Sequence, residues 1–548
     1  MVNTLRFRGR LMIVAVGLVV GAVAPHASAH PDHDGSEGKA AQLTPSPMRR
    51  LVMDVGEAIA RWSPQTFEAA TCSGGTAGAY PCEGVDLLSH LSLSDLGATG
   101  SGNDVWGWID DTSGRAFVLM GHSRGTAFVE VTDPERPVYL GRLPSHTGSS
   151  PWRDIKVYDG HALVVSEAAD HGMQVFDLSA LLDVAAAPVT FSETAHYDGF
   201  GNAHNIVVDE ESGFAYAVGT ATCSGGLHII DVRNPGAPTN AGCYGDDGYT
   251  HDAQCTVYRG PDEDHQGRQI CFAANEDTLT IVDVTNKKSP DLLSRRPYVG
   301  SGYAHQGWLT GDQAYFLLDD ELDEWANGTP TRTYVWDVAD LERPRVVGTH
   351  IAGTASTDHN QYTVGRYTFQ ANYRAGLRVL ELAAVADGEL AEVAWFDVYP
   401  SSDGPGFNGA WSVYPWFDDG LVALSAIEGG LFLLRVATDR IHVHDLAPRA
   451  VDVDAGRWRA KVRVKVRNSA EDPAAGVLVT ARFGAREAQT CSTSADGRCV
   501  IKATLRDVRR QIKFRVLSLE SPGLAYDASA NHDAVGNDGN GTTVRVYQ

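Results

Sequence analysis

Four histidines recur at nearly even spacing in the middle of this 548-residue chain. His204, His251, His305 and His359 are 47, 54 and 54 residues apart. Neutral imidazoles that converge in one place bind Zn²⁺, Cu²⁺, Fe²⁺ or Mn²⁺. A metal that keeps an open coordination position supports hydrolytic, lyase or redox chemistry. The four side chains are therefore a candidate metal site, provided that the fold brings them together.

The sequences around these histidines mark them as equivalent positions of a repeat. The stretches AHNIVV, AHQGWL and DHNQYTV align, and in the remaining repeat either His251 or Asp252 fills the same position. A second interpretation needs no metal, because a His or Asp at the entry of a strand can hydrogen-bond the neighbouring repeat and fix its turn. That structural role would produce the same periodicity.

Other polar and aromatic side chains are expected on the same face, because they lie at the ends of strands in the same repeats. Asp154, Asp252 and Asp358 could add a carboxylate ligand or orient a histidine. The acidic run from Asp319 to Glu324 lacks the residue order of an EF-hand loop, and we interpret it as a solvated loop. The predicted ligand-binding face comprises Asp154, Glu167, Asp252, Asn275, Asp319, Asp358, Asn372 and Trp411.

These positions belong to a repeated β pattern. A six-residue apolar strand recurs at intervals of 44 to 54 residues, as TAFVEV, MQVFDL, LHIIDV, LTIVDV, TYVWDV, LRVLEL and LFLLRV. Two further β-prone runs precede the copies, and a fourth short run follows. Four strands in a repeat of about 50 residues are the signature of a β-propeller blade. The sequence therefore predicts an all-β, seven-bladed β-propeller over residues 83–440.

The ring must close, or an edge strand stays exposed. No fourth strand follows the seventh copy of the repeat. The segment Asp86-Leu87-Leu88-Ser89 matches Asp291-Leu292-Leu293-Ser294, which is the fourth strand of the LTIVDV repeat. Residues 86–93 are therefore predicted to complete the last blade.

The strand phrase is similar to the LVIVD repeat. The stretch from Cys243 to Val284, with CYG, GYTHDAQC and ICFAANEDTLTIVDV, resembles the choice-of-anchor B family of exported bacterial β-propellers. The resemblance covers residues 83–437 and implies the propeller fold and export. That family is named for variable C-terminal anchors, whereas this chain continues into another domain, so we expect free secretion. The resemblance implies no defined activity.

The N-terminus carries the pattern of a secretory signal peptide over residues 1–29. Three arginines precede the apolar run Leu11 to Ala24, and Ala27-Ser28-Ala29 forms a cleavage site. A leader over residues 30–82 contains one expected helix from Met48 to Trp62. No later segment has the length and apolarity of a membrane helix.

Export to an oxidising compartment predicts disulfides. The eight cysteines form four close pairs, and no C-x-x-C spacing suggests a metal site. Pairing between Cys243 and Cys255 remains an alternative, because connectivity does not follow from sequence. The favoured pairs are Cys72 with Cys82, Cys223 with Cys243, Cys255 with Cys271, and Cys491 with Cys499.

Residues 441–548 carry long β-prone segments with turns between them. They predict a β-sandwich that resembles the Ig-like accessory domains of bacterial secreted enzymes. Cys491 and Cys499 flank an Asp-Gly turn, which predicts a staple across a hairpin. A loop near the end could hold Ca²⁺ through oxygen ligands or could simply turn, and we favour the turn. Its candidate ligands are Asn531, Asp533, Asn537, Asp538 and Asn540.

Charge and missing motifs narrow the function. The formal charge of −24 argues against nucleic acid and anionic membranes as partners. The sequence has no H-E-x-x-H or P-loop motif. These features favour a secreted or extracellular binding protein whose ligand is a small molecule, a glycan or a protein. A metal-dependent hydrolase, lyase or oxidoreductase centred on the histidines is the alternative.

Overall fold

The computed structural model describes residues 69–436, 439–454, 456–468, 472–506, 510–521, 524–526, 528, 530–534 and 540–548. The predicted signal peptide and the helix from Met48 to Trp62 lie outside the described residues. The chain divides into two units, Met1–Asp54 and Val55–Gln548. The following description concerns the second unit.

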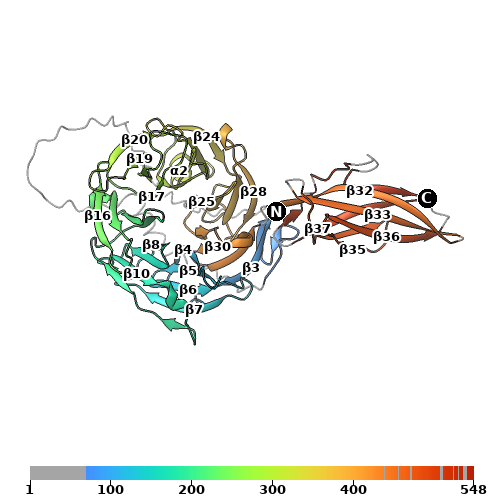
Figure 1. Cartoon of the computed structure of the whole chain (residues 1–548), viewed down its shortest axis with the longest axis horizontal. Helices are drawn as coiled ribbons and strands as arrows, with labels where there is room; N and C mark the ends of the chain where they lie inside the picture. Colours follow the sequence, from blue (N-terminus) through green and yellow to red (C-terminus); the bar gives the residue numbers. More distant parts are fainter. Residues whose placement is uncertain are drawn as a thin grey trace, which may run out of the picture. The chain divides into compact units, whose positions relative to one another are not determined.

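Seven antiparallel sheets follow one another between residues 76 and 436 of the described chain (Figure 1). The first strands of the sheets are β4 (Gly102–Ile109), β8 (Arg153–Tyr158), β13 (Asn205–Asp209), β17 (Asp252–Val257), β21 (Ala304–Leu309), β25 (Asn360–Val364) and β29 (Ala410–Tyr414). The second strands are β5 (Ala116–His122), β9 (His161–Ser166), β14 (Phe214–Val218), β18 (Gln269–Ala274), β22 (Tyr315–Asp320), β26 (Tyr367–Ala371) and β30 (Leu421–Ala426).

The third and fourth strands complete each sheet. The third strands are β6 (Gly125–Glu130), β10 (Met173–Asp177), β15 (Leu227–Asp231), β19 (Thr278–Asp283), β23 (Arg332–Asp337), β27 (Leu377–Glu381) and β31 (Gly430–Val436). The fourth strands are β7 (Val138–Pro144), β12 (Ala195–Tyr197), β16 (Thr239–Tyr244), β20 (Asp291–Pro297), β24 (Arg345–Ile351), β28 (Ala391–Phe396) and β3 (Val85–Leu91). A two-residue strand, β11 (Val189–Thr190), pairs in parallel with β7.

The first strands form a closed inner ring. Each contacts the first strand of the next sheet, from β4 through β8 onward, and β29 contacts β4 again. At the join, β3 pairs antiparallel with β31, from Val85 opposite Val436 to Leu91 opposite Leu431. A segment from the N-terminal side of the ring thus supplies the last strand, and the fold is a β-propeller.

The repeated apolar phrase of the sequence is the third strand of every sheet. Its residues are apolar without alternation because each sheet is covered on both faces by its neighbours. In β19, all six residues from Thr278 to Asp283 are buried. Phe272 and Ile281 pack with Phe316 and Trp336 of the next sheet, so the core consists of layers between adjacent sheets.

Part of the predicted leader belongs to the ring. The hairpin of β1 (Thr76–Ala77) and β2 (Tyr80–Glu83) extends the sheet of β25 to β28, with Cys82 opposite Phe396. Tyr80 is buried in the core there. The predicted domain boundary at residue 83 is therefore too late, because these short strands gave no periodic signal.

The region after residue 438 forms two further sheets. One has the order β36 (Arg498–Arg506), β33 (Arg457–Asn468), β32 (Asp439–Asp454) and β38 (Leu524–Tyr526). The other has the order β35 (Gln489–Ser492), β34 (Leu478–Phe483), β37 (Gln511–Glu520) and β39 (Thr543–Tyr547). Buried and exposed residues alternate along β36 and β37, so each sheet buries one face, and Trp458 lies in the shared core.

Four disulfides join Cys72 to Cys82, Cys223 to Cys243, Cys255 to Cys271, and Cys491 to Cys499. Their number indicates folding in an oxidising environment. The last one ties β35 of one sheet to β36 of the other, so the predicted staple across a hairpin is wrong. Among the described residues, no helix has the length and apolar character needed to cross a membrane.

Candidate functional site

The four repeated histidines lie at the entry of consecutive inner strands and contact one another. His204, His251 and His359 directly precede β13, β17 and β25, and His305 is the second residue of β21. The ring centroids are 4.3 Å apart from His204 to His251, 4.1 Å from His251 to His305 and 4.4 Å from His305 to His359. The series ends at Trp411, 4.8 Å from His359. We call these four imidazoles the axial histidines.

Each axial histidine has one nitrogen in a structural hydrogen bond. Nδ1 of His251 donates to the carbonyl of His305 (2.9 Å), and Nδ1 of His305 donates to that of His359 (3.0 Å). Nδ1 of His359 donates to the carbonyl of Trp411 (2.5 Å). The inter-repeat hydrogen bond that sequence considered as an alternative to a metal therefore exists. It also shows that His251, and not Asp252, is the residue equivalent to His305 and His359 in its repeat.

His204 is oriented differently. Its Nδ1 lies 2.7 Å from a carboxylate oxygen of Glu167, which directly follows β9. A carboxylate on one nitrogen of a histidine fixes the ring and makes the other nitrogen a better ligand. The carboxylate that orients an axial histidine here is Glu167, whereas the sequence suggested Asp154, Asp252 and Asp358 for that role.

The structural hydrogen bonds determine where the remaining lone pairs are. A carbonyl can only accept, so the proton of each imidazole sits on Nδ1 and the lone pair on Nε2. Nε2 of His251 and of His305 is buried and has no hydrogen-bond partner among the described residues. Burial lowers the pKa of both rings well below the usual range and lowers the pKa of His359 to about 3. These rings are therefore neutral at physiological pH.

The carboxyl group of Glu321 faces two of these lone pairs. Oε2 of Glu321 lies 3.7 Å from Nε2 of His305, and Oε1 lies 4.0 Å from Nε2 of His359. The hydroxyl of Tyr373 donates to Glu321 Oε1 over 2.8 Å. Burial raises the pKa of the Glu321 carboxyl to about 8, against the opposing effect of that hydrogen bond. Glu321 itself is completely buried.

The set of His305, His359 and Glu321 has the composition of a metal centre. One ligand atom from each lies within 4.8 Å of the other two. Two imidazoles and one carboxylate are the ligands of several zinc and non-haem iron sites that keep open positions. The arrangement can therefore hold Zn²⁺, Fe²⁺, Mn²⁺ or Cu²⁺ after a contraction of the ligand atoms.

The acidic run around Glu321 is not the solvated loop that the sequence predicted. Asp319, Asp320, Asp323 and Glu324 are all at most 3% exposed. Asp320 accepts the backbone N–H groups of Gly302 and Tyr303 and the hydroxyl of Tyr298. The run turns inward into the short helix α2 (Asp323–Asn327); Asp320 has donors on the preceding loop, whereas the carboxylate oxygens of Asp319 and Glu324 have no hydrogen-bond partner among the described residues.

Two predicted face residues lie deeper along the axis. Asp154 bonds Lys156 Nζ at 2.6 Å and accepts from the backbone of Ile206 at 2.7 Å, so it joins adjacent repeats. Asp252 lines a cavity of about 500 Å³, and burial together with the Asp154 charge raises its pKa to about 7. The aromatic lining of this cavity comprises Trp106, Trp308, Tyr362, Tyr414 and Trp416.

The remaining predicted residues have local partners. Asn275 donates to Asp247 at 2.7 Å, and Asn372 donates to Gln370 at 3.2 Å. One oxygen of buried Asp358 accepts from the backbone of Asp320 at 3.3 Å. The structure does not bring these three side chains onto the axial histidines.

The loop for which Ca²⁺ binding was the less favoured alternative uses its amides for folding. Asn531 Oδ1 accepts from the backbone of Val443, and Asn540 Oδ1 accepts from the backbone of Thr543. Both carboxylate oxygens of Asp533 are buried without a hydrogen-bond partner. Asn537 and Asp538 lie outside the described residues.

Sequence reasoning did not single out Glu321 or Tyr373. A signal for Glu321 was present, because it directly follows the second strand of its sheet, as Glu167 does. Those two equivalent carboxylates both face axial histidines. Tyr373 gave no comparable signal, since buried tyrosines are common in β-propeller cores.

Comparisons with known proteins agree with the fold. The family model described as LVIVD repeat matches residues 200–246 and 267–295. Together with the ring of sheets, this match identifies a repeat β-propeller protein. No curated protein matches the chain.

Several solved structures are similar to the chain at low sequence identity. The β-propeller domain of Cps50 (Swd1) from Myceliophteria thermophila is 11% identical with a TM-score of 0.41, over 62% of this chain and 97% of that one. A Lactobacillus plantarum protein is 13% identical with a TM-score of 0.39, over 74% of this chain and 100% of that one. The extracellular domain of a putative one-component system from B. thetaiotaomicron is 11% identical with a TM-score of 0.39, over 78% of this chain and 55% of that one.

Proposed function

We propose that this chain is an exported β-propeller binding protein that holds one divalent transition metal on its axis. The observation that carries the proposal is the buried convergence of His305, His359 and Glu321, with ligand atoms within 4.8 Å of one another. Nδ1 of each histidine donates to a main-chain carbonyl, and the Tyr373 hydroxyl donates to Glu321. Such hydrogen bonds orient the ligands of a metal. His251 and His204 extend the ligand supply on the neighbouring strands.

The organisation that we propose has four parts. They are a signal peptide over residues 1–29, a leader, a seven-bladed propeller to residue 440 and an Ig-like β-sandwich over residues 441–548. The LVIVD match and the Cys243–Val284 stretch support a relationship to the choice-of-anchor B proteins. The four disulfides and the acidic composition support secretion.

The bound partner in this proposal is a small molecule. The cavity of about 500 Å³ lies within the inner ring, and its aromatic walls suit an apolar or ring-shaped ligand. Trp308 and Tyr362 are each three residues beyond an axial histidine, so about 10 Å of strand separates metal and cavity. A ligand in the cavity could therefore approach the metal along the axis.

Metal analysis of variants tests the axial site. The chain is purified without chelators, and its metal content is measured by mass spectrometry. The double variant H305A/H359A should lose one equivalent of metal per chain relative to wild type, and Glu321→Gln should lose most of it. His122→Ala is the matched control, because His122 is also buried with a bare Nε2 but lies away from the axis. Equal metal content in the double variant and the control would reject the axial site.

The open coordination positions of a His₂Glu set favour a second candidate, a metal-dependent hydrolase, lyase or oxidoreductase. The metal-loaded chain is screened for turnover against esters, phosphoesters, lactones and redox dyes, beside H305A/H359A. Turnover that disappears in the double variant would favour the enzyme. Ligand binding without turnover would favour the binding protein.

A further inference from the structure

Three histidines meet in the C-terminal region, far from the propeller axis along the chain. His442 and His444 belong to β32, and His532 lies in the loop that the sequence analysis considered for Ca²⁺. One ligand atom from each lies within 4.8 Å of the other two. The ring centroids of His532 are 5.1 Å from His442 and 4.9 Å from His444. We call these three side chains the β32 histidines.

Backbone pairing holds His532 beside β32. Its N–H donates to the carbonyl of Val443 over 3.0 Å, and the N–H of Ala534 donates to the carbonyl of His444 over 3.1 Å. The Asn531 side chain accepts from the N–H of Val443 over 2.7 Å and donates to Tyr526 and Thr542. This anchoring brings residues about 90 positions apart together in the fold.

A β-bulge sets the orientation of His444. The pairing of β32 with β33 shifts register between Val443 and Asp445, so His444 is the extra residue of the bulge. Bulges re-aim a side chain relative to a regular strand. His442 is buried, His444 is half-buried and His532 is exposed, so an ion can reach the group from solvent.

The donor atoms select the class of metal. Nδ1 of His532 lies 3.0 Å from the carbonyl of Ala530, which leaves Nε2 with the lone pair. Imidazole nitrogens favour Zn²⁺, Cu²⁺ and Ni²⁺, whereas Ca²⁺ favours oxygen ligands. The amide oxygen of Asn531, the first candidate for Ca²⁺, is engaged by the backbone of Val443.

We infer that His442, His444 and His532 form a transition-metal site of the zinc and copper class, separate from the axial site. Three protein ligands leave at least one coordination position for water or a partner's side chain. The inference does not depend on the proposed axial metal, since no residue is shared. It replaces the oxygen-ligand interpretation of this loop.

Zinc titration of the purified, chelator-stripped chain tests the inference. The H305A/H359A variant provides the background, because it lacks the axial site, and calorimetry measures its Zn²⁺ affinity and stoichiometry. We expect one Zn²⁺ per chain in that background and at least a tenfold weaker affinity after His532→Gln is added. His532 is exposed, so this substitution should leave the fold intact. His161→Gln, at a half-buried histidine outside both groups, should leave the affinity unchanged.

The outcomes separate the two sites. No zinc binding in H305A/H359A, or unchanged affinity after His532→Gln, would overturn the β32 site. If wild type and H305A/H359A each bind one zinc equally well, and only His532→Gln removes it, the result would support the β32 site and reject the axial site. A Co²⁺ titration followed by visible absorption adds a second measurement, since three-imidazole coordination in a four-coordinate site gives intense bands.

Discussion

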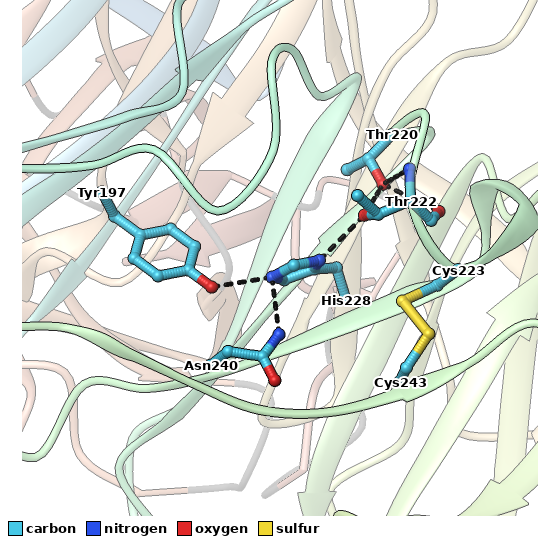
Figure 2. Close-up of a disulfide and its surroundings, with 7 residues drawn as sticks. All are labelled: Tyr197, Thr220, Thr222, Cys223, His228, Asn240 and Cys243. Carbon is cyan, nitrogen blue, oxygen red and sulfur yellow. Dashed lines mark hydrogen bonds between the residues drawn. A yellow bond between two sulfur atoms is a disulfide. The ribbon is translucent and has the colours of Figure 1, made fainter.

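Two buried histidine environments in the propeller differ most in the partners of one ring nitrogen, Nε2. His228, in β15, and His305, at the axis, are both less than 4% exposed, and burial lowers the pKa of both. Figure 2 shows the surroundings of His228, where Nδ1 contacts the hydroxyl of Thr222 and Nε2 contacts Tyr197 and Asn240. The side-chain nitrogen of Asn240 can only donate, so the lone pair of His228 is on Nε2, as it is in His305.

The difference lies in what occupies that lone pair. At His228 it faces the Tyr197 hydroxyl at 2.8 Å and the Asn240 amide at 3.2 Å. At His305 the same nitrogen has no hydrogen-bond partner within the described part of the chain and faces the Glu321 carboxylate at 3.7 Å. Burial and protonation state therefore do not distinguish a structural histidine from a ligand, whereas the state of the second nitrogen does.

The disulfide in Figure 2 reinforces the closed environment of His228. Cys223 directly follows Thr222, and Cys243 pairs with His228 in the register of β15 and β16. The cross-link therefore holds the loop that supplies Thr222 against the strand that supplies Asn240. No disulfide among the described residues cross-links the partners of the axial histidines in this way; main-chain carbonyls hold three of these histidines, and the Glu167 carboxylate holds His204.

The largest expected effect comes from removing His228. His228→Ala leaves the buried hydroxyl of Tyr197 without its bond, removes the contacts to Thr222 and Asn240 and creates a cavity, so it should lower the free energy of unfolding by about 3 kcal/mol. Guanidinium denaturation measures the loss, which should be the same with and without added Zn²⁺. In His305→Ala, by contrast, the stabilisation by Zn²⁺ itself should disappear. A variant at His228 that folds but no longer responds to Zn²⁺ would remove the distinction between the two environments.

A third buried histidine, His122, extends the comparison to the pH dependence of stability. Nδ1 of His122 accepts from the N–H of Arg124, so its bare Nε2 carries the proton and is no ligand. Burial, with the charge of Arg153, lowers the pKa of His122 to about 4. In the unfolded chain the pKa of His122 returns to about 6.5. Between pH 6.5 and 4 the imidazole therefore binds a proton in the unfolded chain but not in the folded one, and stability falls as the pH falls. The loss attributable to this group approaches about 3 kcal/mol at pH 4.

The variant His122→Gln measures how much of the loss of stability at low pH is due to His122. Denaturation of wild type and variant at pH 7 and pH 4.5 should show a smaller pH-dependent loss in the variant, because glutamine does not titrate. Zn²⁺ binding at pH 7 should be equal in the two proteins. Identical pH dependence in both would show that His122 is not held neutral in the folded chain.

The sequence predicted the arrangement of repeats better than the chemistry of individual atoms. The nearly even spacing of His204, His251, His305 and His359 implied convergence, because equivalent positions of a closed ring face one axis. The matched DLLS segments pointed to the strand that pairs with β31. Neither the proton on Nδ1 nor the bare Nε2 follows from spacing, because both depend on which carbonyl the neighbouring repeat presents.

The acidic run from Asp319 to Glu324 shows a second reason why a prediction from the sequence was wrong. Its composition is that of a solvated loop, and the donors that bind Asp320 in its buried position, such as Tyr298, come from a preceding loop and have no signature within the run itself. The β32 histidines show a third reason, since His532 reaches His442 and His444 through a backbone hydrogen bond to Val443, across a long sequence separation. Such pairings carry no local pattern that a single sequence reveals.

The smallest expected effect concerns Tyr373, which positions a ligand of the axial site without touching the metal. Its hydroxyl donates to Glu321 Oε1 over 2.8 Å, the oxygen that faces His359. Loss of a bond that orients a metal ligand typically weakens metal affinity about tenfold. Tyr373→Phe should therefore bind Zn²⁺ about tenfold more weakly at unchanged stoichiometry, as measured by calorimetry.

Tyr216→Phe is the matched control for this substitution. Tyr216 is equally buried, and its hydroxyl has no hydrogen-bond partner among the described residues, so the same chemical change removes no bond. Combining Tyr373→Phe with Glu321→Gln should weaken binding no further than Glu321→Gln alone, because the tyrosine acts through that carboxylate. Additive losses would mean that Tyr373 influences the metal by another route, and the bare nitrogens would then be the only feature that separates the axis from His228.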